Sequence, residues 1–364
     1  MKIAFYAPLK SPRHPVPSGD RLMARLFFRA LEMGGHQVTL ASEFRAFAGS
    51  ADISLNERQQ QAAPEINRLR RDWASQGKPD LWFCYHPYYK APDLLGPALC
   101  REFGVPYVTA ESSYSYRRNQ GEWAASQALV ADGAELAVVN LCLTERDRRG
   151  LAEAVPSAQL ERLDPFIATE EFYLIKPEPK AGELVTVAMM RPGDKLSSYA
   201  ALAKALETLS DTDWRLTVVG DGPARAEVEA LFAGFPPQRV RWRGQLSAQE
   251  VAKALSESWL YVWPGHGEAY GLAYLEAQAA GVPVVAEAVA GVPEVVMDGI
   301  SGSLTPAGDT EAYAAAITRL LEDEASRHAL AASARCFVLQ DRSLQAASKR
   351  LNDILKARIG GGHE

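Results

Sequence analysis

GHGEAYGLAYLEAQAAGVPVVAE, residues 265–287, joins a glycine-rich loop, a helix pattern and a strand pattern in one short stretch. Helical apolar spacing begins near Gly271 and stops at Gly281, a residue typical of a helix end. The β-rich run PVVAE follows. Loop, helix and strand in this order are the repeating unit of a parallel α/β sheet. Glu268 in the loop and Glu276 one turn inside the helix interrupt a mostly apolar run.

The same alternation extends along the whole chain. Segments with apolar residues every three to four positions separate the β-rich runs KIAFYAP, HQVTLAS, DLWFCYH, VPYVTAE, LAVVNLCLT, LVTVAMM, WRLTVVG, RVRWRG, WLYVWP and PVVAE. The first helical segment stops at Gly34 and Gly35, and its predicted buried face comprises Leu22, Leu26, Phe27, Ala30 and Leu31. The pattern predicts an α/β fold with parallel sheets in both halves.

A chain of 364 residues is long enough for two domains. LDPFIATEEFYLIKPEPKAGE, from Leu163 to Glu183, has three prolines and little periodicity, as an inter-domain connection would. We therefore expect one α/β domain over residues 1–165 and a second over 166–340. Residues 341–364 should hold a helix, with packing on the first domain left open, and a disordered tail. Two such domains in tandem would create a cleft beyond the carboxyl ends of their strands.

Composition excludes several classes of protein. Hydrophobic residues make up 47% and charged residues 23%, as in ordinary globular proteins, and the net charge of -6 argues against a nucleic-acid partner. No apolar run approaches the roughly 18 residues of a membrane span, and prolines follow too early for a signal peptide. The prediction is a cytoplasmic protein, with peripheral contact at the inner membrane face left open. The four cysteines lack zinc-site spacing and are expected to be buried free thiols, namely Cys84, Cys100, Cys142 and Cys336.

Two glycine-bearing turns follow strands of the second half. In MMRPGDK, Arg191 and Lys195 stand four residues apart and could direct two cations at one anion such as a diphosphate. The alternative is a pair of solvated surface charges. In VVGDGP, Gly220 and Gly222 favour a tight turn, and the motif does not match the G-x-G-x-x-G dinucleotide fingerprint.

The two glutamates of the opening stretch admit several interpretations. Eight helical residues would separate them by about 12 Å of rise and about 80° of rotation, which fits a glycosidase pair poorly. Metal ligands would need partners that the sequence does not place nearby. A third option is two carboxylates that accept hydrogen bonds from hydroxyl-bearing rings on either side of a diphosphate, with backbone N–H groups around residues 270–272 facing the anion. Glutamates on a solvated helix face are the fourth.

These motifs resemble the retaining glycosyltransferases of family four, which have the GT-B fold of two facing Rossmann-like domains with an inter-domain cleft. The stretch GEAYGLAYLEAQAAGVPVVAEAVAGVPEVVMDGISGSL is similar to the E-x7-E region of that family and the strand and tail that follow it. MMRPGDK resembles its phosphate loop, VVGDGP its donor-domain turn, and KIAFYAP with SGDRLMARLFFRALEMGGHQVTLAS its N-terminal strand, glycine loop and helix. The similarity spans nearly the whole chain.

The resemblance implies roles for individual residues. Arg191 and Lys195 would hold the donor diphosphate and stabilise the leaving group, Glu276 would bind the ribose, and Glu268 would contact the donor sugar. Gly19 would let the N-terminal loop approach the diphosphate closely. The remaining donor-binding positions would be Gly220, Asp221, Ala269, Tyr270, Gly271 and Leu272. The family needs neither a metal nor a cofactor, because the nucleotide-sugar is a co-substrate and Arg and Lys supply the counter-charge.

The N-terminal domain would bind the acceptor. Many family members have a His where this chain has Glu111, and His86 at the end of the preceding strand is an alternative contributor to catalysis. The acceptor loops would be Pro8–Ser18, Tyr85–Lys90 and Ser112–Trp123. Exposed tyrosines could stack on the acceptor and two arginines could meet a phosphate, and these residues are Tyr88, Tyr89, Tyr114, Tyr116, Arg117 and Arg118. The alternative, which we favour for any single tyrosine, is a loop residue that packs on its own domain.

The resulting hypothesis is a retaining, metal-independent, hexosyltransferase-type enzyme. It would move a sugar from a UDP- or GDP-sugar to a glycan, lipid-linked or small-molecule acceptor, with closure of the two domains completing the site. Two alternatives remain open at this point. One is a sugar phosphorylase or epimerase on the same fold, and the other is a non-catalytic nucleotide-sugar binding protein.

Overall fold

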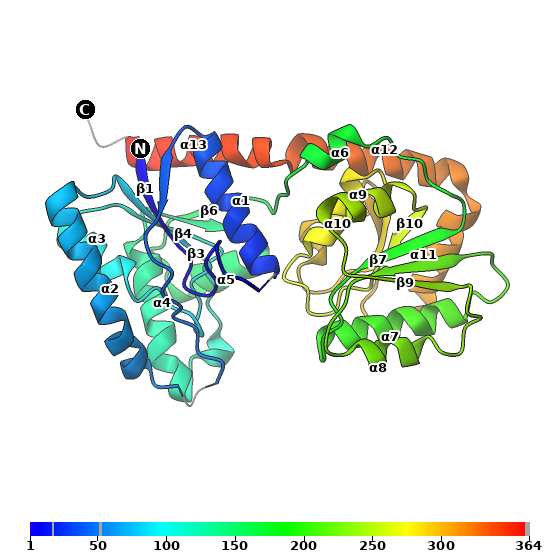
Figure 1. The fold of residues 1–364 in the computed structure, drawn as a ribbon, viewed down its shortest axis with the longest axis horizontal. Helices are drawn as coiled ribbons and strands as arrows, with labels where there is room; N and C mark the ends of the chain where they lie inside the picture. The colour runs from blue at the N-terminus through cyan, green and yellow to red at the C-terminus, as the bar shows by residue number, and fades with distance from the viewer. Residues whose placement is uncertain (17, 51–52, 361–364) are drawn as a thin grey trace. The chain divides into compact units, whose positions relative to one another are not determined.

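The computed structural model describes residues 1–16, 18–50 and 53–360. They form two compact units; in Figure 1 the first is coloured blue to green and includes the red C-terminal helix, and the second is coloured green to orange. The N-terminal unit comprises residues up to Asp164 together with the described residues from Leu344 onward, and the C-terminal unit spans Pro165–Ser343. The sequence-based divisions lay at 165/166 and 340/341. The expected disordered tail from residue 361 onward lies outside the described residues.

The N-terminal unit is a six-stranded parallel sheet in the order β2-β1-β3-β4-β5-β6. Its strands are β1 Lys2–Tyr6, β2 Gln37–Leu40, β3 Leu81–Tyr85, β4 Tyr107–Ala110, β5 Val139–Cys142 and β6 Leu160–Arg162. Its helices are α1 Gly19–Met33, α2 Leu55–Gln76, α3 Gly96–Phe103, α4 Ala124–Leu136, α5 Glu145–Ala154 and α13 Leu344–Ile359, with short 3-10 turns at Tyr116–Arg118 and Gly121–Trp123. The strand order reverses between β1 and β3, where ligands of such sheets bind beyond the carboxyl ends.

Burial explains why these segments are strands and helices. All five residues of β3 are buried, as expected for a parallel strand covered on both faces. Helix α1 begins after Ser18, whose side chain caps the N–H of Arg21, and ends at Gly34, as the sequence predicted. Leu22 was wrongly assigned to its buried face, because the helical register turns this side chain outward. Helix α13 packs against α1, and Ser348 donates a hydrogen bond to the carbonyl of Ala30 at 2.6 Å.

The C-terminal unit is a second six-stranded parallel sheet, in the order β12-β11-β10-β7-β8-β9. Its strands are β7 Glu183–Val187, β8 Arg215–Val219, β9 Val240–Gly244, β10 Leu260–Val262, β11 Val284–Glu287 and β12 Gly302–Thr305. Its helices are α6 Glu170–Leu174, α7 Asp194–Glu207, α8 Arg225–Leu231, α9 Ala248–Ser256, α10 Leu272–Ala279, α11 Thr310–Glu322 and α12 Glu324–Asp341, with a 3-10 turn at Val292–Glu294. Here the order reverses between β7 and β10.

The structure confirms the predicted α/β class and every strand quoted from the sequence. Two strands were not predicted, β6 and β12, and both are short and lie at the edge of their sheet. The proline-rich connection contains the short helix α6.

Three of the cysteines, Cys84, Cys100 and Cys142, are buried free thiols as expected. Cys336 is free but exposed, because it lies on the outward face of α12, so the prediction was wrong for this residue. Over the residues that the structure describes, helices long and apolar enough to cross a bilayer are absent.

Candidate functional site

Three loops meet at the carboxyl edge of the C-terminal sheet, next to the reversal of strand order. The loop after β7 and the turn after β8 are joined by backbone hydrogen bonds, from Ala188 N–H to Val219 O and from Met190 N–H to Asp221 O, each 3.0 Å long. Gly220 has φ +139°, and a Cβ there would overlap the carbonyl oxygen of Ala188. The predicted tight turn is therefore built on a glycine that allows two backbones to touch.

Arg191 and Lys195 occupy the loop after β7 and the first turn of α7. The guanidinium of Arg191 is exposed and has no partner among the described residues. Lys195 instead forms an ion pair with Glu268, a residue 73 positions away. Of the two predicted cations, Lys195 is thus paired with a predicted carboxylate, whereas Arg191 is exposed to solvent.

Glu268 lies in the loop after β10, where a tryptophan also holds it. The indole Nε1–H of Trp263 donates to Oε1 of Glu268 at 2.9 Å, and the Lys195 ammonium group lies 5.6 Å from the centre of the Trp263 ring. Tyr199 packs edge-on against this indole at 4.8 Å. Only 14% of the Glu268 side chain is exposed. The carboxylate is therefore fixed in position and partly removed from water.

The helix predicted to start near Gly271 does so. Gly271 precedes α10 with φ +82°, and a Cβ there would press on the ring of Tyr274. Gly291 donates its N–H to the carbonyl of Glu268 at 3.1 Å, and a Cβ at Gly291 would overlap the carbonyl of Ala269. The backbone from Ala269 to Leu272 is thereby held from both sides. Ala269 is exposed, whereas the side chain of Tyr270 is buried.

Glu276 lies on α10, is partly buried, and has no hydrogen-bond partner for its carboxylate in the described part of the chain. Burial raises the pKa of Glu276 to about 7. Placing an unpaired carboxylate out of water costs free energy. The arrangement therefore suits a ligand that supplies hydrogen-bond donors.

The sequence did not reveal a chain of three hydrogen-bonded side chains, Ser197, His266 and Glu287, which we call the relay. The Oγ of Ser197 lies 2.6 Å from Nδ1 of His266, whose Nε2 lies 3.3 Å from Oε2 of Glu287. The same Oε2 accepts the N–H of Gly308 at 2.8 Å, and the N–H of His266 donates to Ser198 Oγ at 3.0 Å.

An ionised carboxylate can only accept, so Nε2 of His266 donates to Glu287; in the neutral ring Nδ1 then accepts from the Ser197 hydroxyl. The relay ties α7 to the turn that carries Glu268. The sequence signal was a histidine directly inside the glycine-rich loop.

The N-terminal unit holds a second group at its own carboxyl edge. His86 and Glu111 directly follow β3 and β4, and both have left-handed backbone, with φ of +58° and +57°. Such backbone is strained for residues other than glycine and concentrates at functional sites. His86 Nδ1 lies 3.3 Å from Oδ1 of Asp20, and the Tyr85 hydroxyl donates to Glu111 Oε2 at 2.9 Å. His86 and Glu111, which the sequence offered as alternatives, therefore both lie at this edge of the sheet.

Charge determines the protonation of this group. Burial alone would lower the pKa of His86, but the neighbouring carboxylates of Glu111 and Asp20 raise it to about 9. Burial would raise the pKa of Asp20, yet the hydrogen bond and charge of His86 hold it below its ordinary value. Burial also raises the pKa of Glu111, and the His86 charge offsets this only in part. His86 is consequently an imidazolium at neutral pH.

Gly19 is the first residue of α1 and directly precedes Asp20. A Cβ at Gly19 would meet nothing within 4 Å, so packing within the chain does not require glycine there. The preceding loop is braced by arginines, since Arg21 donates to the carbonyl of His14 at 2.9 Å and Arg25 to that of Pro12 at 2.6 Å. Pro17, part of the predicted acceptor loop, lies outside the described residues.

The tyrosines expected to be exposed are mostly not. Tyr116 is 50% exposed, but Tyr88, Tyr89 and Tyr114 are partly buried because aromatic neighbours pack on them edge-on or stacked. For these three tyrosines the structure therefore agrees with the alternative interpretation, in which the loop residues pack on their own domain. Arg117 and Arg118 are exposed, as expected.

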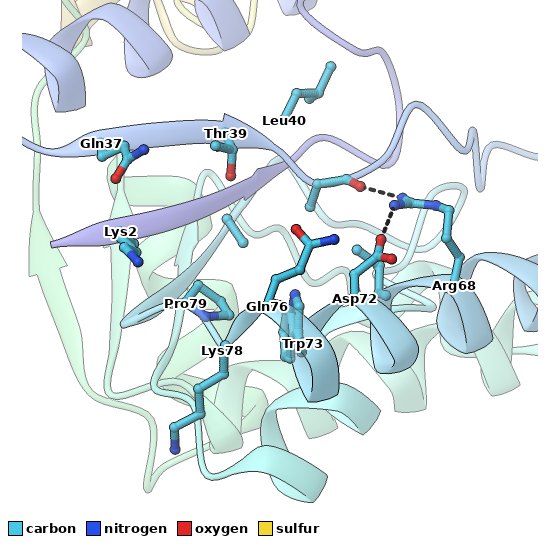
Figure 2. A pocket seen from close by; sticks show the side chains of 14 residues that line it. Lys2, Gln37, Thr39, Leu40, Arg68, Asp72, Trp73, Gln76, Lys78 and Pro79 are labelled. Carbon is cyan, nitrogen blue, oxygen red and sulfur yellow. Dashed lines mark hydrogen bonds and ion pairs between the residues drawn. The ribbon is translucent and has the colours of Figure 1, made fainter.

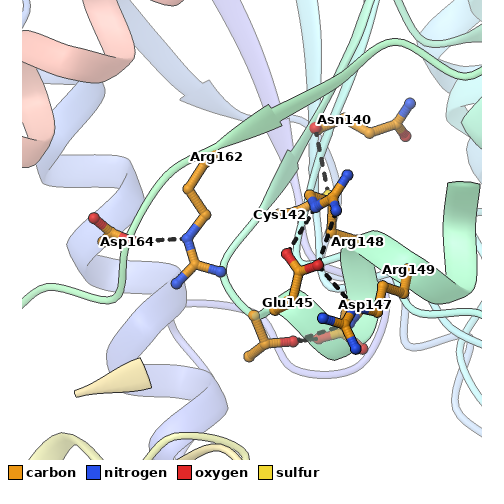
Figure 3. A network of polar contacts seen from close by, with 9 residues as sticks. Asn140, Cys142, Glu145, Asp147, Arg148, Arg149, Arg162 and Asp164 are labelled. Atoms are coloured by element: carbon orange, nitrogen blue, oxygen red, sulfur yellow. Dashed lines mark hydrogen bonds and ion pairs between the residues drawn. The ribbon is translucent and has the colours of Figure 1, made fainter. Parts of the chain in front are cut away.

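Figure 3 shows the polar network that follows β5 in the N-terminal unit. Arg148 and Arg149 donate to the carboxylate of Glu145 at 2.7–2.8 Å and lower the pKa of Glu145 to about 2. Asp147 is buried and accepts a 2.6 Å hydrogen bond from Thr144. These charges satisfy one another and stabilise the start of α5.

A polar pocket of about 300 Å³ lies between α2 and the edge strand β2 of the N-terminal sheet (Figure 2). Arg68 crosses its rim and donates to Asp72 at 2.9 Å and to the carbonyl of Ala41 at 2.7 Å. Lys2 and Gln37 begin the strands that line it. The pocket lies along the outer edge of the sheet, away from the reversal of strand order between β1 and β3 where ligands of such sheets bind, so we assign it no role.

Among the described residues, groups of three or more His, Cys, Asp or Glu side chains able to hold a metal ion are absent. The candidate site is therefore defined by cations, carboxylates and backbone at strand ends.

These features define an α/β protein with a candidate anion and polyol site in its C-terminal unit. Residues 182–323 match the family described as Glycosyl transferases group 1, which confirms the resemblance found in the sequence. The C-terminal unit thus carries a group 1 glycosyltransferase domain.

Known proteins with the same organisation confirm the architecture. Sucrose-phosphate synthase from Thermosynechococcus elongatus superposes with a TM-score of 0.76 at 18% identity, covering 99% of this chain and 100% of the other. Anabaena HepE, solved with UDP and glucose, gives a TM-score of 0.72 at 14% identity, with coverages of 98% and 100%. The chain has the GT-B architecture, with two Rossmann-like units.

Curated relatives match at lower coverage. The GDP-mannose-dependent alpha-(1-6)-phosphatidylinositol monomannoside mannosyltransferase of Mycolicibacterium smegmatis is 29% identical over 290 residues, which is 73% of this chain and 74% of that protein. Among the first relatives matched, the shared region spans from 27% to 74% of the relative's own length.

Proposed function

We propose that the protein is a retaining glycosyltransferase that uses a nucleotide-sugar donor and needs no metal ion. The observation that carries this proposal is the grouping of Arg191, Lys195, Glu268 and an unpaired Glu276 at one sheet edge of a group 1 glycosyltransferase domain. Two cations suit a diphosphate, and two carboxylates suit hydroxyl-bearing rings on either side of it.

In this mechanism, Arg191 and Lys195 stabilise the negative charge that develops on the departing diphosphate. The bond from the anomeric carbon to the diphosphate oxygen breaks while a bond to the acceptor oxygen forms on the same face. The acceptor proton passes to the departing diphosphate, so the reaction requires no protein base. Glu276 holds the ribose and Glu268 the sugar.

The N-terminal unit supplies the acceptor groups in this proposal. Glu111 there accepts a hydrogen bond from an acceptor or donor hydroxyl, and the charge of the neighbouring His86 counteracts part of the rise in pKa that burial causes. Arg117 and Arg118 offer an exposed cationic pair to an acceptor that carries a phosphate.

Thermal-shift measurements with UDP-, GDP- and ADP-sugars test the proposal, since a ligand that binds only the folded state raises the melting temperature. One of these donors should stabilise the protein and be hydrolysed slowly, with no loss of hydrolysis in EDTA. Sugar release that depends on added phosphate would instead identify a phosphorylase. Donor binding without any hydrolysis or transfer would identify a binding protein, and no shift with any donor would refute the proposal.

Replacing Gly19 by alanine should weaken donor use without weakening the fold. A Cβ meets nothing within 4 Å here, and alanine favours the helix more than glycine does, so the melting temperature should stay equal or rise slightly. The resemblance implies that the backbone at Gly19 comes close to the donor diphosphate, so the added methyl would obstruct that approach, and we expect the KM for the donor to rise about tenfold.

Gly34→Ala, at the opposite end of α1, is the control that adds the same methyl group away from the site. An unchanged donor KM in Gly19→Ala would show that no ligand approaches the start of α1.

A further inference from the structure

Lys195 and Glu268 form an ion pair, although the proposed function assigns them to different parts of the donor. That function assigns Lys195 to the diphosphate and Glu268 to the sugar, yet in the structure the two side chains neutralise each other. Their side chains are 28% and 14% exposed, so both charges lie in surroundings less polar than water. Removing the partner from a charge in such surroundings costs far more than at an open surface.

We infer that the protein binds its donor by exchanging this ion pair and thereby favours the nucleotide-sugar over the nucleoside diphosphate. The inference rests on the proposed function. A diphosphate that draws Lys195 away leaves the Glu268 carboxylate with only the 2.9 Å hydrogen bond from Trp263 among the residues that the structure describes. A nucleotide-sugar repairs the loss, because its sugar hydroxyls donate to the vacated carboxylate. A nucleoside diphosphate has no such group and binds at the full cost of the broken pair.

The surroundings of the pair support an exchange of side-chain partners without a change of backbone. The relay of Ser197, His266 and Glu287 ties the first turn of α7 to the turn that carries Glu268. Gly291 holds the backbone of Glu268 from the other side at 3.1 Å. The lysine side chain is long and flexible, whereas the indole of Trp263 is fixed by its packing on Tyr199. The carboxylate therefore stays in place while the ammonium group moves.

The exchange also accounts for product release. Once the sugar has been transferred, the remaining nucleoside diphosphate competes with Glu268 for the same ammonium group. The pair reforms as the product leaves, so the site returns to its starting state.

Glu268→Gln is the decisive variant, since it keeps an acceptor for Trp263 and removes the charge that holds Lys195. We expect it to bind UDP or GDP, whichever base the donor screen selects, about tenfold more tightly than the wild type. It should bind the matching UDP-glucose or GDP-mannose about tenfold more weakly. Isothermal titration calorimetry on the full chain measures both constants. Glu276→Gln is the control, because loss of the ribose contact should weaken both ligands by the same factor.

A double-mutant cycle separates exchange from simple repulsion between Glu268 and phosphate. If the gain acts through Lys195, it should disappear when Glu268→Gln is made in a Lys195→Ala background. A gain that persists there would overturn the inference, as would unchanged or weaker UDP or GDP binding by Glu268→Gln. Both results leave the proposed function intact, because the donor screen, the hydrolysis assay and the phosphate test decide that function separately.

Discussion

Replacing Arg191 by alanine should lower turnover by about 10²–10³-fold, the usual loss when a group that stabilises developing charge is removed. The guanidinium is exposed and has no partner in the described structure, so nothing in the fold depends on it. The melting temperature should therefore stay within about 1 °C of the wild type. Steady-state kinetics with a saturating donor and a melting curve together measure this prediction.

Lys204→Ala is the matched control for Arg191→Ala, because Lys204 is also an exposed cation of this region but lies in the last turn of α7. It should retain full activity. Arg191→Lys should fall between the two, since lysine keeps the charge and loses the planar pair of donors. Full turnover in Arg191→Ala, or an equal loss in Lys204→Ala, would remove Arg191 from the proposed mechanism.

Replacing Glu276 by glutamine should weaken donor binding by about 10–100-fold at pH 8, because an ionised acceptor of ribose hydroxyls is lost. The pKa of about 7 adds a pH dependence. Wild-type affinity for the donor should rise as the pH increases from 6 to 8 and the carboxylate ionises. Binding should also release protons near pH 7, which calorimetry in two buffers of different ionisation enthalpy detects. The affinity of Glu276→Gln should be flat over this range.

As the pH rises from 6 to 8, the stability of the wild-type protein should fall, whereas its affinity for the donor should rise. A carboxyl group whose folded pKa is raised favours the folded state fully below its ordinary pKa, and this contribution is lost as the pH rises through about 7. Glutamine stays neutral at every pH, so the variant does not lose this contribution to stability. Glu276→Gln should therefore melt higher than the wild type at pH 8 and near it at pH 5.

Glu207→Gln, at the exposed end of α7, is the control and should change neither affinity nor stability. A variant of Glu276 that is less stable at pH 8, or a wild-type affinity that does not change with pH, would contradict the role assigned to this carboxylate.

Most of the fold could be predicted from the sequence because parallel strands are buried on both faces and appear as continuous apolar runs. LWFCY of β3 is entirely buried and was easy to recognise. The edge strand β6 is only partly buried along its three residues and has no such run. The strand orders of the two sheets differ, and no local pattern encodes which strands become neighbours.

The candidate site could be predicted only where spacing along the chain matters. Gly271, the start of α10 and the position of Glu276 follow from local patterns. The pairing of Lys195 with Glu268 spans 73 positions, and the sheet alone brings the two together. The same is true of the contact from His266 to Glu287 across two strand ends. Left-handed backbone at His86 and Glu111 is imposed by tertiary packing, because neither residue type favours it as glycine does.

The central claim is that the C-terminal unit binds a nucleoside diphosphate at the ends of β7, β8 and β10. A crystal structure of the protein with the UDP or GDP selected by the donor screen tests it most directly. The claim predicts the diphosphate within hydrogen-bonding distance of Arg191 and Lys195, the ribose on Glu276, and the ammonium group of Lys195 withdrawn from Glu268. A nucleotide bound elsewhere, or bound here with Arg191 and Glu276 making no contact to it, would contradict the claim.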